Sequence, residues 1–274
     1  MTAVETQQFT QPDQFGFHVA MSATLLLVSA HTFNHGATFV YMRASSTSDY
    51  VFKESLVPTT HSRGGAAWYG VSAAICSPST VVVGAARRDY SQNGLRATSS
   101  GAVHVFDLVS GNFTEHPSSP LWNTNPGQAD FFGRSMACTA TILAVGAPSD
   151  DHDIDPSEQD VGSVSILRRD QDGNFTRVTK LLGTTPEGEI GGSLAINALN
   201  VIVTALKTSN ERGVLQVIEQ ISATAFNTTR TVLTSGGSSS TGSLGVAVSE
   251  HNVMVAGAPQ EGSSTTGSTF VFHP

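Results

Sequence analysis

The chain has 274 residues, a formal net charge of −8 and only 13% charged side chains, against 39% hydrophobic ones. A helical protein would be richer in Glu, Lys, Arg and Leu, so this balance favours many short strands joined by turns. The acidic charge and the lack of clustered Lys and Arg argue against nucleic acid or anionic membrane as a partner. The longest apolar stretch, residues 19–30, is too short and too polar to span a bilayer and predicts a strand hairpin.

Residues 1–13 have neither a basic start nor an apolar segment, so they do not resemble a secretory signal. We therefore expect an extracellular or cell-surface protein if a leader has been removed, and an intracellular protein otherwise. Two cysteines, Cys76 and Cys138, are too few for a disulfide framework. We interpret them as buried thiols.

A short apolar run that contains or ends in alanine occurs five times, which indicates an internal repeat. The runs cover residues 25–31, 81–87, 142–148, 201–207 and 253–259. Their shared alanines, spaced 55, 62, 58 and 53 residues apart, are Ala30, Ala85, Ala147, Ala205 and Ala258. Such a period makes each unit one supersecondary structure that must pack against its neighbours.

Each unit contains further strand patterns around this run. An aromatic or aliphatic residue and a glycine precede it, starting at 15, 69, 132, 190 and 244. A run that begins with glycine follows it, at 36, 101, 162, 213 and 267, and a fourth run closes four of the units, at 50, 112, 174 and 227. Four short strands bounded by Gly, Ser or Pro form a meander, and five meanders predict an all-β, five-bladed propeller with four antiparallel strands per blade.

We expect one domain, residues 1–274. Its blades are predicted at about 13–60, 66–120, 129–185, 187–235 and 241–274, the last completed by residues 1–11. The fifth unit ends after its third strand, so we predict that residues 4–11 supply the fourth and close the ring. Small residues dominate the aligned innermost strands, as close packing around an axis requires; the first column reads His18, Ser72, Ser135, Ser193 and Ala247.

These motifs resemble the FG-GAP repeats of integrin α-chain-type propellers. The matching residues are FG at 15 and 132, YG at 69, VGAP at 145 and AGAP at 256. The resemblance implies a propeller, although integrin-type propellers have seven blades and the period here allows five. Many members of that family bind calcium in Asp-rich loops between the first and second strands. The corresponding loops here lack the carboxylates, so those sites are not expected.

Three patterns are candidates for metal binding. Asp151, Asp153 and Asp155 alternate in the acidic run 149–160 and can offer oxygens to Ca²⁺; the alternative is a solvated loop, because the turn glycine of a calcium site is missing. Asp170 and Asp172 precede Gly173, where hairpin turn chemistry is the preferred interpretation. His31 and His35 lie four residues apart in a loop without a third zinc ligand. No other cofactor is expected.

Three sequons match the N-glycosylation pattern, at Asn112, Asn174 and Asn227. All three fall at the turn before the fourth strand of a unit or at the start of that strand, and therefore on one rim of the propeller. Glycosylation is expected only if the protein is secreted; otherwise asparagine is there because it suits the turn.

The candidate ligand-binding residues are Trp122, Trp68, Tyr90, Arg87 and Arg88. Exposed aromatic faces on a propeller rim can stack on sugar rings. Trp68 shares its register with Phe131, directly before the aromatic-Gly pair, so the alternative for Trp68 is packing between blades. For Trp122 the sequence favours neither alternative.

The connectors between blades and the loops between second and third strands open on one face and vary in length. Variable loops on a rigid scaffold favour a non-enzymatic recognition module for a protein or a glycan. The alternatives are a lectin specifically, a structural subunit of a larger assembly, and a propeller glycoside hydrolase. Hydrolysis needs paired carboxylates near the axis, whereas the innermost strands offer only Glu250, at one end.

Overall fold

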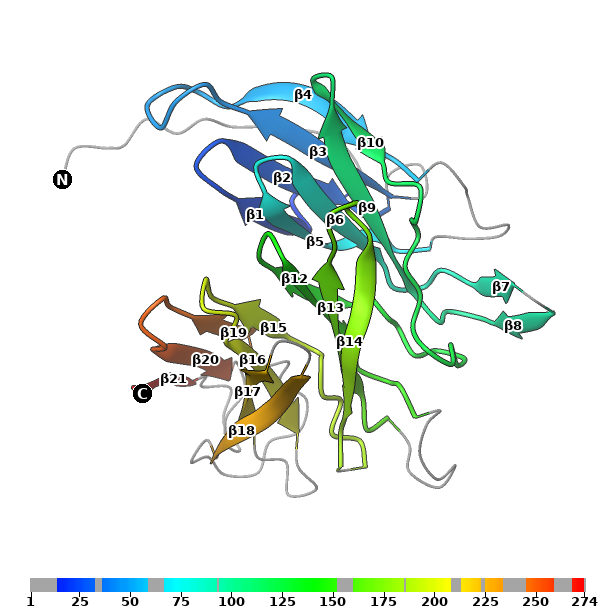
Figure 1. Cartoon of the computed structure of the whole chain (residues 1–274), viewed down its shortest axis with the longest axis vertical. Coiled ribbons are helices and arrows are strands. Elements are labelled where there is room, and N and C mark those ends of the chain that lie inside the picture. Colours follow the sequence, from blue (N-terminus) through cyan, green and yellow to red (C-terminus); the bar gives the residue numbers. More distant parts are fainter. Residues whose placement is uncertain are drawn as a thin grey trace.

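The computed structural model describes residues 14–32, 36–58, 67–92, 94–151, 160–184, 186–207, 213–222, 225–233, 245–258 and 268–273. These residues form five small antiparallel sheets that follow one another in chain order around a ring (Figure 1). The fold is a five-bladed β-propeller, as the repeat predicts. Within the described ranges, no helix is long and apolar enough to cross a membrane.

The strands follow the predicted runs closely. Blade 1 consists of β1 (His18–Met21), β2 (Leu25–Ala30), β3 (Ala37–Met42) and β4 (Val51–Leu56). Blade 2 consists of β5 (Tyr69–Ser77), β6 (Thr80–Ala85), β9 (Ala102–Val109) and β10 (Asn112–Glu115), with a hairpin, β7 (Tyr90–Gln92) and β8 (Leu95–Ala97), inserted after β6. Blade 3 consists of β11 (Ser135–Cys138), β12 (Ile142–Ala147), β13 (Ser163–Arg169) and β14 (Phe175–Leu182).

Blade 4 consists of β15 (Leu194–Ile196), β16 (Ile202–Lys207), β17 (Gly213–Ser222) and β18 (Ala225–Leu233). Blade 5 consists of β19 (Gly245–Val248), β20 (Met254–Ala258) and β21 (Ser268–Phe272). The predicted fourth strand of blade 5, residues 4–11, lies outside the described residues, so closure of the ring by this segment stays a prediction.

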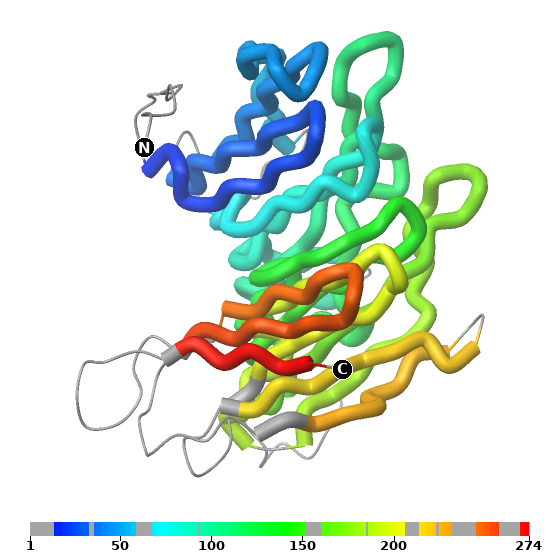
Figure 2. The backbone as a smooth tube through the Cα atoms, turned by 90° about the vertical axis from the view of Figure 1, so that its left-hand side faces the viewer, coloured from blue at the N-terminus to red at the C-terminus, as the bar shows by residue number. Residues whose placement is uncertain are grey.

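The apolar core lies between the blades. Figure 2 shows the sheets stacked face to face from blade 1 in blue toward blade 5 in orange and red. Each junction between consecutive blades contains one cluster of buried apolar side chains drawn from both sheets, such as Val82 of β6 with Leu143 of β12. The second strands β6 and β12 are buried along their whole length, which explains why their sequences are apolar without alternation.

Glycine in a second strand allows the next blade to approach. A Cβ atom built at Gly84 would meet the backbone oxygen of Gly133, and one at Gly146 would meet that of Gly191. Only glycine leaves the room that these contacts need. The Gly-Ala ending of β6 and β12 is therefore a packing element, whereas a Cβ atom at the equivalent Gly257 of β20 meets nothing within 4 Å.

The first column of the innermost strands links each blade to the next. Ser72 Oγ donates to the carbonyl of Gly133 over 2.6 Å, and Ser135 Oγ donates to that of Gly191 over 2.6 Å. His18 Nε2 lies 2.9 Å from the carbonyl of Ala73 at the junction of blades 1 and 2. These residues are small or polar because they bond across the junction as well as fit near the axis.

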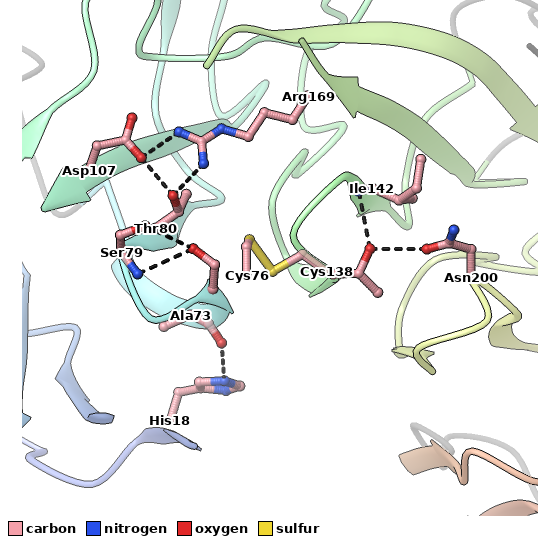
Figure 3. Close-up of a disulfide and its surroundings, with 12 residues drawn as sticks. His18, Ala73, Cys76, Ser79, Thr80, Asp107, Cys138, Ile142, Arg169 and Asn200 are labelled. Carbon is pink, nitrogen blue, oxygen red and sulfur yellow. Dashed lines mark hydrogen bonds and ion pairs between the residues drawn. A yellow bond between two sulfur atoms is a disulfide. The ribbon is translucent and has the colours of Figure 1, made fainter. Parts of the chain in front are cut away.

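The interpretation of the cysteines as buried thiols is wrong. Cys76 of β5 and Cys138 of β11 form a disulfide that joins the innermost strands of blades 2 and 3 (Figure 3). The two residues are 62 apart, which equals the repeat step between these blades, so they occupy equivalent positions in adjacent sheets. At the same end of the junction, Arg169 donates to Asp107 over 2.6 Å and adds a second link between the two blades.

Candidate functional site

The same tight turn lies at the beginning of the innermost strand or directly before it in four blades. In each, the N–H of the fourth residue donates to the carbonyl of the first over 3.0 to 3.1 Å; the pairs are Phe17 to Gln14, Val71 to Trp68, Arg134 to Phe131 and Gly192 to Glu189. The third residue is a glycine with a φ between 85° and 92°. Only glycine adopts this conformation readily, as a type II turn demands at this position. The aromatic-Gly motif is thus the sequence of this turn.

The first residue of each turn also has a positive φ, although none is glycine. The values are 59° at Gln14, 51° at Trp68, 56° at Phe131 and 49° at Glu189. A left-handed backbone is unfavourable for bulky side chains and is retained only where the surroundings fix it. The scaffold therefore holds Trp68 and Phe131 rigidly, beside the axis, on the face formed by the blade connectors. We call this the connector face.

Five side chains meet there and form what we call the axial cluster: Phe17, His31, Trp68, Arg87 and Phe131. The Trp68 and Phe131 rings are nearly parallel, at 17° and with centroids 6.5 Å apart. The Arg87 guanidinium lies 3.7 Å from the Trp68 centroid and 5.9 Å from that of Phe131. Phe17 is 47% exposed and packs on His31 at 4.0 Å between centroids. The cluster thus combines accessible aromatic surface with a fixed cation.

A second arginine lies close to this cluster. Arg134 follows the Phe132-Gly133 pair, and its charge, together with burial as the larger cause, lowers the pKa values of His18 and His31. Both imidazoles are therefore neutral at pH 7. Burial also lowers the pKa of Arg134 itself, which nevertheless stays protonated in the usual pH range.

Three other predicted ligand-binding residues come together farther from the axis. Tyr90 and Trp122 pack edge to face with centroids 5.1 Å apart, and the Arg88 guanidinium lies 5.6 Å from the Trp122 centroid. The inserted hairpin β7–β8 brings Tyr90 to Trp122, which lies on the connector from blade 2 to blade 3. Arg87 and Arg88, although adjacent in sequence, therefore belong to different clusters.

The prediction that Arg88 contacts a ligand does not fit its position. Arg88 is only 7% exposed, and its Nη1 donates to His104 Nε2 over 2.7 Å. Since Nε2 accepts this bond, Nδ1 carries the proton and donates to Glu115 Oε1 over 2.6 Å. Burial lowers the pKa values of both Arg88 and His104. Arg88 is an internal group of blade 2 that lies near the Trp122 ring.

A buried polar network anchors the connector that carries Trp122 and Phe131. Asn123 Nδ2 donates to Asp150 Oδ2 over 2.7 Å, and the Gly127 N–H donates to Asp130 Oδ2 over 2.7 Å. Asp150 also accepts a bond from Ser163 and forms an ion pair of 2.9 Å with Lys180. Burial, and secondly the charge of Asp150, raise the pKa of Asp130 to about 6.

The metal predictions are tested only in part. Asp153, Asp155 and His35 lie outside the described residues, and Asp151 is the last described residue before that gap. Among the residues that the structure does describe, no group of three or more His, Cys, Asp or Glu side chains can hold a metal ion. Asp170 accepts the backbone N–H groups of Asp172 and Asn174 with its carboxylate, over 3.0 and 2.8 Å, which confirms the hairpin turn.

The sequons lie where the repeat places them. Asn112 begins β10, Asn174 directly precedes β14, and Asn227 is the third residue of β18. Asn112 and Asn227 are exposed, whereas Asn174 is half-buried and bonds the carboxylate of Asp170. All three belong to hairpins between third and fourth strands, on the face opposite the connector face. Whether they carry glycans stays a prediction.

The sequence predicts Trp68 and Arg87 as binding residues but does not single out three residues around them: Phe17, Phe131 and Arg134. A signal for them exists in the aligned repeats. Trp68 and Phe131 occupy one column, directly before the aromatic-Gly pair, and Phe17 and Arg134 occupy another, directly after it. A comparison of these two alignment columns across the blades would have identified Phe17, Phe131 and Arg134.

No family profile matches this chain, and no curated protein matches it, so the resemblance to FG-GAP repeats stays a prediction. Solved structures with a similar fold include the subtype N10 neuraminidase-like protein of the little yellow-shouldered bat isolate from Guatemala. It is 10% identical with a TM-score of 0.42, and the match covers 93% of this chain and 81% of that one. The subtype N11 neuraminidase-like protein of the flat-faced bat isolate from Peru is 12% identical with a TM-score of 0.43, covering 93% and 69%.

A third similar structure is a triple arginine mutant of AofleA from Arthrobotrys oligospora. It is 9% identical with a TM-score of 0.33, and the match covers 95% of this chain and 89% of that one. Because these identities and TM-scores are low, we draw no conclusion about function from the three structures.

Proposed function

We propose that this chain is a non-enzymatic recognition module that binds a glycan or a protein on its connector face. The observation that supports this most directly is the axial cluster. There, Trp68 and Phe131 are held nearly parallel by strained turns, with the Arg87 guanidinium against Trp68. A rigid aromatic pair beside a fixed cation is a typical binding-site composition, because it loses little conformational entropy when the ligand binds.

The chemistry near the axis favours binding over hydrolysis. Glycoside hydrolysis requires two carboxyl groups on either side of the scissile bond. The five innermost strands contain neither Asp nor Glu. The axial cluster consists of arginine, histidine and aromatic side chains, and among the described turn positions equivalent to Trp68 one carries a carboxylate, Glu189.

The disulfide supports an extracellular location. Disulfides persist in oxidising compartments and are rare in the cytosol, and Cys76–Cys138 joins two blades close to the axis. An extracellular protein would also meet the glycosylation machinery, which is consistent with the exposed sequons at Asn112 and Asn227.

The proposal is tested by removing the Trp68 ring. We expect Trp68→Gly to weaken ligand binding at least about tenfold, because a central aromatic anchor contributes strongly to affinity. Glycine is chosen because it tolerates the positive φ at this position. The measurement applies the 274-residue protein to an array of glycans and to an array of purified extracellular proteins.

Arg96→Gln on the exposed hairpin β7–β8 serves as the control, because it alters the connector face outside the axial cluster. It should bind like the wild type. Equal binding by wild type and Trp68→Gly would contradict the proposal, as would release of sugar from any glycoside.

A further inference from the structure

Two arginines near the axial cluster have no carboxylate partner within the described residues. The ion pairs of this part of the chain involve other groups, namely His104 with Glu115, Arg169 with Asp107, Lys180 with Asp150 and Arg230 with Glu219. Arg87 is exposed and lies on the Trp68 ring, while Arg134 is half-buried. Partial burial of a charge without a counter-ion is unfavourable, so an arriving anion would be stabilised here.

The negative charge of the rest of the protein makes the two arginines a distinctive site for an anion. The whole chain carries a net charge of −8, yet the Arg87 guanidinium lies on the Trp68 ring. Arg134 ends the turn that begins at Phe131, and its charge acts on the His31 ring of the cluster. Guanidinium is the side chain best suited to bind a planar carboxylate or a sulfate, because its N–H groups form a fork. An anion is repelled by most of the surface of an acidic protein and attracted to a local positive site, so it binds there.

The aromatic part of the site indicates what carries the anion. The Arg87 guanidinium lies within 6 Å of both ring centroids, and the rings themselves are 6.5 Å apart. The apolar and the charged groups therefore fall within the span of a single sugar ring. An acidic pyranose offers an apolar C–H face and a negative group on the same small unit, whereas a protein partner would need a far larger contact area.

We propose that the axial cluster binds an anionic sugar, whose carboxylate or sulfate is held by Arg87 and Arg134 and whose ring lies against Trp68 and Phe131. This inference rests on the proposed recognition function and specifies its ligand. The His31 ring, whose Nδ1 is buried and has no hydrogen-bond partner among the described residues, packs against Trp68 from the blade 1 side. It borders the site on that side.

The experiment compares three defined oligosaccharides by titration calorimetry: a uronic acid oligosaccharide, the same chain with its carboxyl groups reduced to alcohols, and the reduced chain carrying sulfate esters. The wild type should bind at least one acidic form about tenfold or more tightly than the neutral form. Which of the two acidic forms binds more tightly distinguishes a carboxylate from a sulfate as the natural anion.

The variants assign the effect to residues. Arg87→Gln and Arg134→Gln should each reduce the acidic preference about tenfold while leaving binding of the neutral sugar nearly unchanged. Arg96→Gln, a matched exposed arginine outside the cluster, should retain the preference. Raising the salt concentration should weaken binding of the acidic oligosaccharides by the wild type more than by the Arg87→Gln and Arg134→Gln variants.

The outcomes separate this inference from the proposed function. Equal binding of the acidic and neutral chains, or an acidic preference that survives both arginine substitutions, would overturn the anionic sugar and leave the recognition module in place. Binding of a purified protein that depends on Trp68, with no sugar bound, would likewise overturn the sugar alone. Failure to bind any member of either array would contradict both proposals.

Discussion

At the scale of single residues, Gly84 and Gly146 in the second strands of blades 2 and 3 determine how closely the next blade packs. A methyl group at Gly146 would collide with the backbone oxygen of Gly191 in the next blade, where no flexible side chain can move aside. We expect Gly146→Ala to lower the free energy of unfolding by about 1 to 3 kcal/mol, the usual range for overpacking. Urea denaturation followed by fluorescence measures this difference.

Gly245→Ala is the matched control, because a Cβ atom at Gly245 meets nothing within 4 Å. This substitution in β19 should change stability by less than about 1 kcal/mol. If the two variants were equally stable, the close approach of blades 3 and 4 would not be the reason for glycine at position 146.

At the scale of an element, the connector from blade 2 to blade 3 depends on protonation. The folded protein raises the pKa of Asp130 to about 6 from 3.8, because the carboxyl is buried and lies near Asp150. The folded state therefore binds this proton more tightly than the unfolded state does. The contribution of Asp130 to stability must fall as the pH rises from about 4 through 6, by about 1 to 3 kcal/mol in total.

Asp130→Asn should abolish this dependence, since the amide does not titrate in this range. Urea denaturation of both proteins between pH 4.5 and 7.5 should show the variant gaining stability relative to the wild type as the pH rises. A stability difference that stays constant over this interval would show that Asp130 titrates normally.

At the scale of the whole molecule, the disulfide joins two blades across 62 residues. A loop of this length restricts the unfolded chain strongly, and loop-closure estimates give a stabilisation of about 4 kcal/mol. We expect the Cys76→Ser/Cys138→Ser variant to unfold at a lower denaturant concentration by a corresponding amount. Adding a reductant should destabilise the wild type toward the variant and leave the variant unchanged, whereas equal stability with and without the bond would contradict this role.

The sequence was sufficient to predict the five-bladed architecture, because the repeat consists of residues whose structural roles are local. Gly70 and Gly133 mark turns with a positive φ, and second strands such as β12 are continuous apolar runs. These features depend only on chain neighbours and on burial, so a repeated pattern identifies them. The fourth strands of blades 1 to 4 were located for the same reason, since turns such as Asp170–Asn174 have a recognisable sequence.

The candidate site was less predictable, because it depends on contacts between blades. Nothing local distinguishes Arg87, which is exposed and lies on the Trp68 ring, from Arg88, which bonds His104 inside blade 2. The cysteines were misjudged because their number was considered without their separation. Side chains that meet across a junction become visible in a sequence only when equivalent positions of adjacent repeats are compared.

The turn that displays Trp68 and Phe131 has a further consequence. It occurs with the same backbone geometry in four blades, yet its first position holds Gln14, Trp68, Phe131 and Glu189 in turn. The backbone therefore tolerates a polar, an aromatic and an acidic side chain at this position without a change of fold. Substitutions at the first position of each turn would therefore change the binding preference of such a propeller one blade at a time, while its architecture stays constant.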